Sequence, residues 1–278
     1  MSAAGTRLLG VLALIVVRGG VGSLAAQAQL RQDATWTLEG ARGGYCVWYL
    51  ADPDLARKLV PATTVLTPAG TGAGLPLLLA STIREEPRFA QWILGSICLG
   101  FYQRVSSGDH TLAEGKASHP IIVATNALAA ENAHGVAGAT AYLLDFMTDN
   151  RSLASAADQI GLDMSGIEYL ARVRVEGGDP AVTITVAGTV ISWSGHTIAD
   201  SSVGTTQSVS FGYGRPRGAN WLVQLESAPA SSRLIVGNLS IAGRNTLAKA
   251  LLASPARAIG PQVSGGTTTL TFHVATKK

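Results

Sequence analysis

The sequence YLLDFMTDNRSLASAADQIGLDMSGIEYLARVRVE, which spans Tyr142–Glu176, contains the clearest succession of structural signals in the chain. It predicts a strand, a turn at Thr148–Asn150, an amphipathic helix over Arg151–Gln159, a loop and a second strand. Gly161 follows the helix, where glycine commonly ends one. A helix and loop held between two apolar strands can form one wall of a binding site, so we expect the site here.

The first 28 residues have the features of a cleaved secretory signal. Arg7 precedes an apolar run of ten residues, Leu8–Val17, and Ala26-Gln27-Ala28 matches a small-x-small cleavage site. Ten apolar residues are too few to cross a bilayer, which takes about 20. We therefore expect a secreted or periplasmic protein that begins at Gln29, with residues 29–278 forming one domain and no membrane span after cleavage.

The composition favours a globular protein with a large core and argues against nucleic-acid binding. Hydrophobic residues make up 47% of the chain and charged residues only 14%. The whole chain carries a formal charge of +3, and Arg7 and Arg18 leave with the signal, so the mature chain is close to neutral. A nucleic-acid-binding domain needs a basic surface, which this charge balance does not provide.

Cys46 and Cys98 are the only cysteines. In an exported chain two cysteines can form a disulfide, and both lie in predicted strands. Buried free thiols are the alternative, because cysteine is among the most buried residue types. The sequence leaves this choice open.

The remaining chain reads as many short strands and few helices. Asp52, Pro53 and Pro61 mark the start and end of a first helix, and the last helix covers about Asn245–Ala253. With the helix at Arg151–Gln159 this makes about three helices and about a dozen strands, which predicts an α+β fold built on a large, mainly antiparallel β-barrel or cone. The predicted strands include Thr35–Leu38, Tyr45–Leu50, Leu77–Ser81, Ile93–Val105, Ile121–Thr125 and Ala139–Met147, and Ser106–His119 is predicted as a polar loop.

Common catalytic and cofactor motifs are missing from the sequence. The run Gly70-x-Gly72-x-Gly74 precedes a predicted strand, whereas a dinucleotide-binding loop follows one and opens a helix. The five histidines show no metal-ligand spacing, and no GxSxG nucleophile elbow occurs. We therefore expect no cofactor and no metal.

Two charged residues interrupt or end apolar strands. Asp145 lies in an otherwise apolar strand, where a carboxylate must be paired, face a polar site or be protonated. Arg104 ends the apolar strand ILGSICLGFYQR, a position from which a guanidinium can bind a carboxylate. Each also has a plainer interpretation, in which Asp145 takes the solvated face of its strand and Arg104 is solvated at the sheet rim.

Two stretches together resemble the acetoacetate decarboxylase-like superfamily. YLADPDLARKLVPATTVL, over Tyr49–Leu66, is similar to the family's tyrosine-bearing strand, helix and VPxxL segment, with Thr64 in place of the family's leucine. Tyr142–Val173 is similar to its strand, Asp-Asn turn and helix. Ser227–Leu252 resembles its late segment more loosely. The resemblance implies a β-cone or barrel with an internal binding site.

The family's chemistry uses a lysine of lowered pKa that forms an imine with a ketone. By this resemblance the lysine would fall at Met164 or Ser165, and neither side chain can form an imine. The chain has only five lysines, and Lys116 is the one in a predicted loop. The resemblance therefore implies the fold without the imine chemistry.

We carry three hypotheses forward. The first is an exported protein that binds a small, largely apolar carboxylate or carbonyl compound without an imine; a homo-oligomer is left open. The second is a lyase, or a hydrolase, of a small keto acid, with Asp145, Glu131 or His134 as the acid–base group. The third is an envelope structural protein. The expected ligand-binding residues are Tyr102, Arg104, Tyr142, Asp145, Met147, Met164 and Ser165.

Overall fold

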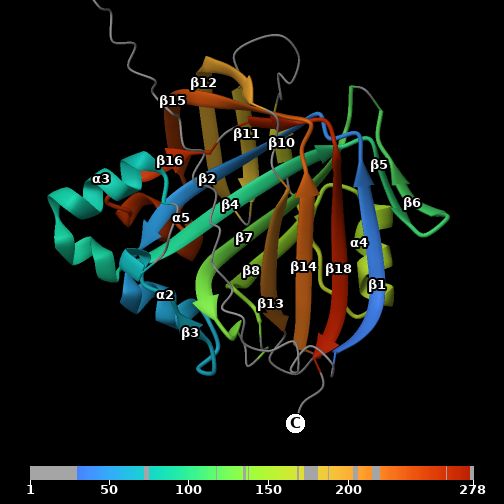
Figure 1. The fold of residues 1–278 in the computed structure, drawn as a ribbon, viewed down its shortest axis with the longest axis horizontal. Helices are drawn as coiled ribbons and strands as arrows, with labels where there is room; N and C mark the ends of the chain where they lie inside the picture. The colour runs from blue at the N-terminus through green and yellow to red at the C-terminus, as the bar shows by residue number, and fades with distance from the viewer. Residues whose placement is uncertain are drawn as a thin grey trace, which may run out of the picture.

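Strands β2 (Gly43–Ala51) and β4 (Ile93–Tyr102) lie side by side near the middle of the computed structural model, and core residues pack on both of their faces (Figure 1). The structure describes residues 30–275 except 72–74, 117, 134, 135, 137, 168, 172–180, 187, 203–205, 215–219 and 261. The expected signal, residues 1–28, lies outside this part.

The described part of the chain holds four α-helices and two short 3-10 helices among many strands. The helices are α2 (Pro53–Leu59), α3 (Leu77–Glu85), α4 (Arg151–Gln159), α5 (Thr246–Ala253), η1 (Ala69–Thr71) and η2 (Pro87–Gln91). The other strands are β1 (Leu30–Glu39), β3 (Val65–Leu66), β5 (Arg104–Ser107), β6 (His110–Glu114), β7 (Ile121–Glu131), β8 (Ala141–Thr148), β9 (Ser165–Gly166), β10 (Tyr169–Ala171), β11 (Ala181–Val186), β12 (Thr189–Ser202), β13 (Gln207–Gly214), β14 (Asn220–Ala228), β15 (Ser231–Ala242), β16 (Arg257–Ile259), β17 (Gln262–Ser264) and β18 (Thr267–Ala275).

The strands form one large mixed sheet. One part runs β6–β5–β1–β18–β14–β13, all antiparallel. β13 then pairs in parallel with β8, which continues through β7 and β4 to β2. From β2 the sheet passes through β17 to β15, β12, β11 and β10. The predicted large, mainly antiparallel sheet is confirmed.

The predicted closed barrel is wrong. Among the described residues β6 pairs only with β5 and β10 only with β11, so the two ends of the sheet do not meet. The parallel contact between β13 and β8 covers two residue pairs, Phe211–Ala141 and Gly212–Tyr142. The sheet therefore curls around its core without closing.

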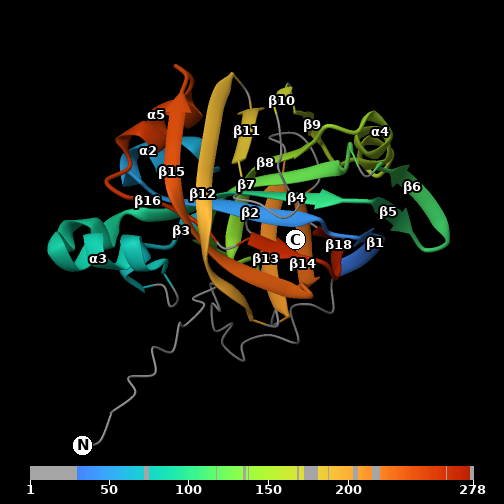
Figure 2. The same ribbon diagram turned by 90° about the horizontal axis from the view of Figure 1, so that it is seen from above.

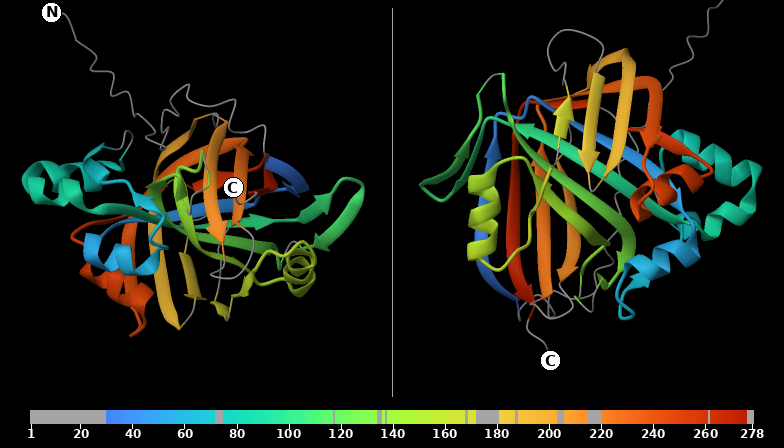
Figure 3. Two further views of the ribbon diagram at one scale, coloured as in Figure 1. Left: turned by 90° about the horizontal axis from the view of Figure 1, so that it is seen from below. Right: turned by 180° about the vertical axis from the view of Figure 1, so that it is seen from behind.

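The helices gather at two ends of the sheet. α2, α3 and α5 lie together at one end and α4 at the other, beyond which the β5–β6 hairpin projects (Figure 1, Figure 2). Seen from behind, α4 lies beside β18 and β1 (Figure 3), and its Leu153 and Ala157 share a core cluster with Trp36 and Phe272. This cluster is called the helix-side core below.

The opposite cluster, called the central core below, takes one face of β2, β4 and β7. Side chains alternate between the faces of a strand. Tyr45, Val47 and Tyr49 of β2 accordingly belong to the central core, whereas Leu50 packs toward Leu79 of α3 in a third cluster. Strands β11, β12 and β15 also contribute residues to the central core.

Local capping signals place two helices where the sequence predicts them. The Asp52 carboxylate accepts hydrogen bonds from the backbone N–H groups of Asp54 and Leu55 at 2.9 and 3.1 Å. The Asn150 side chain accepts one from Leu153 N at 3.0 Å. Each oxygen satisfies N–H groups that have no partner inside the helix.

Two local predictions are wrong, and one long strand was not predicted. Leu77–Ser81 belongs to helix α3, not to a strand, because leucine and alanine favour helices and a short apolar run does not separate the two states. The predicted loop Ser106–His119 contains part of the β5–β6 hairpin, which turns at Gly108 with φ +56°. The long strand β12 went unpredicted because serine, glycine and histidine break its apolar pattern.

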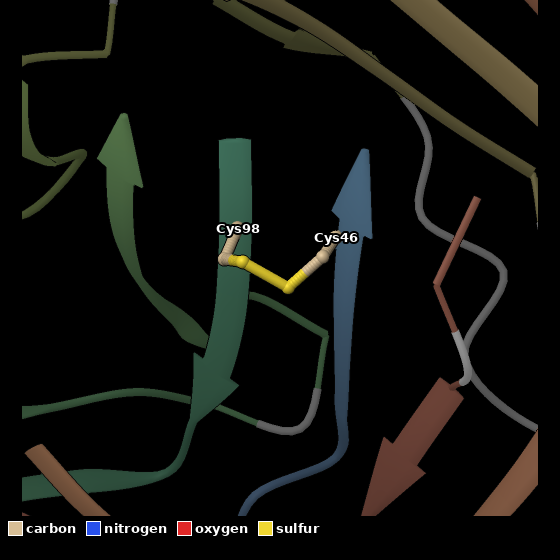
Figure 4. The surroundings of a disulfide bond; sticks show 2 residues. All are labelled: Cys46 and Cys98. Carbon is tan, nitrogen blue, oxygen red and sulfur yellow. A yellow bond between two sulfur atoms is a disulfide. The ribbon is translucent and has the colours of Figure 1, made fainter. Parts of the chain in front are cut away.

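A disulfide joins Cys46 and Cys98 (Figure 4). The two residues are direct partners in the register of β2 and β4, with their Cα atoms 4.0 Å apart. Both lie on the face of the sheet opposite the central core, since they alternate with Val47 and Ile97. The sequence left open whether the two cysteines form a disulfide or are buried free thiols, and the structure has the disulfide.

Candidate functional site

A chain of three polar side chains crosses the otherwise apolar central core. Asn126 Nδ2 donates a hydrogen bond to Asp145 Oδ2 at 2.8 Å. On its other side, the Tyr49 hydroxyl donates to Asn126 Oδ1 at 3.4 Å. Asn126 is 2% exposed and Asp145 is half-buried, so the chain connects the core to a more accessible carboxylate. These residues come from β2, β7 and β8.

A β-bulge aims Asp145 toward this cluster. The register of β7 and β8 shifts between Asn126 and Ala127, whose partners are Asp145 and Leu143. Leu144 is the extra residue, and both Asp145 and Tyr142 can then lie on the side of the central core. Bulges commonly re-aim a side chain in this way, and they are frequent beside active sites.

Glycine at position 95 makes the space for Tyr49. The two residues are direct partners across β2 and β4. A Cβ atom added to Gly95 would overlap the Tyr49 ring, so no larger residue fits without moving the ring. The tyrosine is thus held against the strand, with its hydroxyl directed to Asn126.

Burial keeps the tyrosines of this cluster protonated. Burial and then the nearby Asp145 carboxylate raise the pKa of Tyr49, and the same two causes in the same order raise the pKa of Tyr142. A tyrosinate would be desolvated and would face a second negative charge. The site therefore presents neutral hydroxyl donors beside a carboxylate.

The structure brings together three of the expected ligand-binding residues. Tyr142 and Met147 are buried in the central core, and Asp145 lies between them on β8. Tyr102 and Met164 belong to the helix-side core instead. The Tyr102 hydroxyl donates to Thr268 Oγ1 at 3.4 Å, and burial raises its pKa.

The other expected residues lie at the surface or outside the described part. Arg104 is exposed, and its Nε lies 3.9 Å from the Glu39 carboxylate. Ser165 and Glu131 are also exposed. His134 lies outside the described residues, so its role as an acid–base group stays a prediction.

Tyr49 and Asn126 were missing from the predicted site. Asn126 interrupts the apolar strand IIVATNALAA just as Asp145 interrupts its own strand, and that shared pattern was a usable signal. The sequence does not single out Tyr49, because aromatic residues are common in apolar strands and are usually part of the hydrophobic core.

The lysines described by the structure all lie at the surface. Lys58, Lys116 and Lys249 are exposed, on α2, before β7 and on α5 respectively. Lys277 and Lys278 lie outside the described residues. Met164, at the position where the resemblance places the reactive lysine, is buried in the helix-side core and not beside Asp145.

Within the described ranges, no three His, Cys, Asp or Glu side chains gather as metal ligands. Within the same ranges, no helix is both long enough and apolar enough to span a membrane.

Comparison with solved structures identifies the fold. Acetoacetate decarboxylase from Legionella pneumophila superposes with a TM-score of 0.50 and 11% sequence identity, covering 99% of this chain and 98% of that chain. Another acetoacetate decarboxylase structure gives a TM-score of 0.45 at 10% identity, with 93% of each chain covered. The enduracididine biosynthesis enzyme MppR, complexed with pyruvate, gives 0.46 at 13% identity, with 88% of this chain and 89% of that chain covered.

No protein-family profile matches the chain, and no curated protein sequence matches it. The predicted resemblance to the acetoacetate decarboxylase-like superfamily is thus confirmed at the level of the fold. A remote relationship of this kind fits the low sequence identity.

Proposed function

We propose that this protein is an exported member of the acetoacetate decarboxylase-like fold that binds a small, largely apolar carbonyl or carboxylate compound without forming an imine. The site is the central core around Asp145, Asn126 and Tyr49. The observation that carries the proposal is this polar chain, which crosses an apolar core that has no described lysine near it.

The proposal that no imine forms rests on where the described amines lie. An imine forms only from a neutral amine, and a solvated lysine has a pKa near 10.4, so burial or a neighbouring cation must lower it. Lys58, Lys116 and Lys249 are exposed, so none of these three amines is buried in an apolar site. The described lysines thus lack the setting of a reactive amine.

The polar chain suits the recognition of a small molecule. Ligand sites are mostly apolar, with a few polar groups that fix the orientation of the ligand. Asn126 uses one acceptor position of Asp145, and a carboxylate offers about four. Asp145 can therefore accept a further hydrogen bond from a ligand O–H or N–H group.

The second candidate is a lyase or hydrolase that uses Asp145 as its acid–base group. The specific observation in its favour is the position of Asp145, a half-buried carboxylate beside the protonated hydroxyls of Tyr49 and Tyr142. A carboxylate within reach of a bound keto acid can take or give a proton. Turnover of a keto acid that is lost in Asp145→Asn supports this candidate over binding alone.

The test of the proposed function is a thermal-shift screen with small ketones, keto acids and fatty acids. We expect at least one compound to raise the melting temperature of the wild type, and to do so much less in Asp145→Asn. Asp158→Asn, an exposed change on α4, is the matched control and keeps the response. If no compound from these three classes stabilises the wild type, the protein is better explained as a structural component of the envelope.

Export is tested separately by mass spectrometry of the natural protein. A mature chain beginning at Gln29 supports it, and an intact chain beginning at Met1 in the cytosol contradicts it.

A further inference from the structure

The Cys46–Cys98 disulfide and the polar chain lie on opposite faces of the same three strands (Figure 4). Cys46 and Tyr49 both belong to β2. Cys98, on β4, pairs across to β7 with Thr125, the residue that precedes Asn126. A change in how β2, β4 and β7 lie relative to one another therefore acts on both the bond and the polar chain.

The disulfide sets the spacing of β2 and β4 close to the polar chain. It holds the Cα atoms of Cys46 and Cys98 4.0 Å apart. Facing residues of an unlinked antiparallel pair lie about 4.5–5.5 Å apart, so opening the bond allows these strands to separate by about 0.5–1.5 Å. The Tyr49 ring lies over Gly95, its partner on β4, and this pair is three residues along each strand from the bond.

The hydrogen bond from the Tyr49 hydroxyl to Asn126 Oδ1 is sensitive to such a movement. Its length is 3.4 Å, whereas a hydroxyl donor usually lies about 2.7–2.8 Å from its acceptor. To reach Asn126 on β7, the tyrosine extends across β4. A change in the spacing of β2 and β4 therefore alters this contact directly.

The bond lies where a thiol can reach it. Cys46 and Cys98 are both partly exposed, whereas Tyr45 and Val47, which flank Cys46 and face the central core, are buried. Thiol–disulfide exchange needs a thiolate to reach one of the two sulfurs, and exposed disulfides are more labile than sealed ones. This exposure favours a bond that can open in the folded protein.

The strands have enough other contacts to stay paired without the bond. β2 and β4 face each other in nine consecutive residue pairs, of which Cys46–Cys98 is the fourth. In the chain-entropy model a disulfide stabilises a fold mainly by constraining the unfolded chain. Opening it can thus lead from one folded state to another.

We propose that the Cys46–Cys98 disulfide is a redox-sensitive clasp, which a dithiol reductant opens in the folded protein, and that opening it shifts the polar chain of Tyr49, Asn126 and Asp145. One thiolate of the reductant attacks a cysteine sulfur, the S–S bond breaks, and the other cysteine leaves as a thiolate that takes a proton. The second thiol of the reductant then displaces the first cysteine, so two electrons and two protons reach the protein and the reductant becomes a disulfide. The inference goes beyond the proposed function and needs no ligand.

The test treats the full mature chain with dithiothreitol in the absence of denaturant. Alkylation followed by intact-protein mass spectrometry should find both cysteines modified, while circular dichroism stays that of a folded protein. Nitrogen-15 NMR follows the side-chain amide of Asn126, whose signal is assigned by its loss in Asn126→Leu. This signal should move on reduction and return on reoxidation, because the amide oxygen accepts from Tyr49.

Two controls separate the clasp from a general effect of the reductant. Cys46→Ser/Cys98→Ser should show the Asn126 signal at its reduced position from the start, and dithiothreitol should not move it. The side-chain amide of Asn150, which caps α4 at the far end of the sheet, should keep its position throughout (Figure 1).

Three results overturn the inference. The bond opens only after denaturant is added, the reduced chain unfolds, or the bond opens while the Asn126 signal stays in place. The first two make the disulfide a structural staple, and the third shows that it is not coupled to the polar chain. None of them affects the proposed function, which the ligand screen decides, and failure of that screen leaves the clasp standing.

Discussion

Asn126 and Asp145 face each other across a β-bulge, with the amide Nδ2 of one 2.8 Å from the carboxylate Oδ2 of the other. The amide oxygen of Asn126 accepts from Tyr49, so a single buried amide serves both neighbours. Removing the amide leaves a carboxylate and a hydroxyl in the core without their partner. The two residues are therefore expected to depend on each other for stability.

Asn126→Leu should lower the free energy of unfolding by about 1–3 kcal/mol, the cost of leaving buried polar groups unsatisfied. The double change Asn126→Leu/Asp145→Leu should cost less than the sum of the single changes, because the apolar pair leaves no carboxylate behind. Urea denaturation of the four proteins measures this coupling. If the losses in the free energy of unfolding are strictly additive, the hydrogen bond between Asn126 and Asp145 contributes nothing to stability.

Gly95→Ala should destabilise the protein by about 1–3 kcal/mol, the usual cost of an overpacked core. The added methyl group overlaps the ring of Tyr49, which pairs with Gly95 across β2 and β4. In a Tyr49→Leu background the ring is absent, so Gly95→Ala should cost much less there. An equal cost in both backgrounds would place the effect in the strand backbone and not in the ring contact.

Alkaline pH should destabilise the protein through its buried tyrosines. Burial raises the pKa of Tyr45 from 10.0 to about 12, so above pH 10 the unfolded chain loses this proton before the folded chain does. The stability that depends on the neutral hydroxyl is present below pH 10 and is lost as the pH rises to about 12. Tyr45→Phe should flatten this decline by about 1.4 kcal/mol per pH unit. Denaturation curves at pH 9, 10 and 11 check it, and identical slopes would contradict it.

Reduction of the Cys46–Cys98 disulfide should lower stability by on the order of 3–4 kcal/mol, because the bond closes a loop of 52 residues in the unfolded chain. Unfolding with and without reductant measures the difference, and Cys46→Ala/Cys98→Ala, which reductant should not affect, is the control. Thiol titration of the denatured, non-reduced protein should find no free thiol. Two free thiols per chain would rule out the bond.

The sequence predicted those elements that carry their own start and stop signals. Asp52 caps α2 as expected, and α4 covers Arg151–Gln159 as predicted, with Asn150 as its cap. Capping depends on neighbouring residues alone. Prediction from the sequence was wrong where contacts between residues far apart in the chain determine the structure. Whether Leu77–Ser81 forms a helix depends on what Leu79 packs against, and the open sheet depends on pairings between strands far apart in the chain.

The candidate site was predicted in part for the same reason. Asp145 stood out because a carboxylate interrupts an apolar strand. Tyr102 and Met164 were expected beside it but lie in the helix-side core. Tyr102 follows Phe101 on β4, and side-chain alternation sends Phe101 to the central core and Tyr102 to the other side. The bulge that turns Asp145 toward Asn126 is not visible without the register of the strands.

The central claim is that this protein binds a carbonyl or carboxylate compound without forming an imine. The most direct measurement is intact-protein mass spectrometry after incubation with acetoacetate and sodium borohydride, followed by peptide mapping. The account predicts an unchanged mass, at acetoacetate concentrations that trap a lysine-dependent acetoacetate decarboxylase treated in parallel. A reduced adduct on Lys58, Lys116 or Lys249 would contradict it and would move the reactive centre away from Asp145.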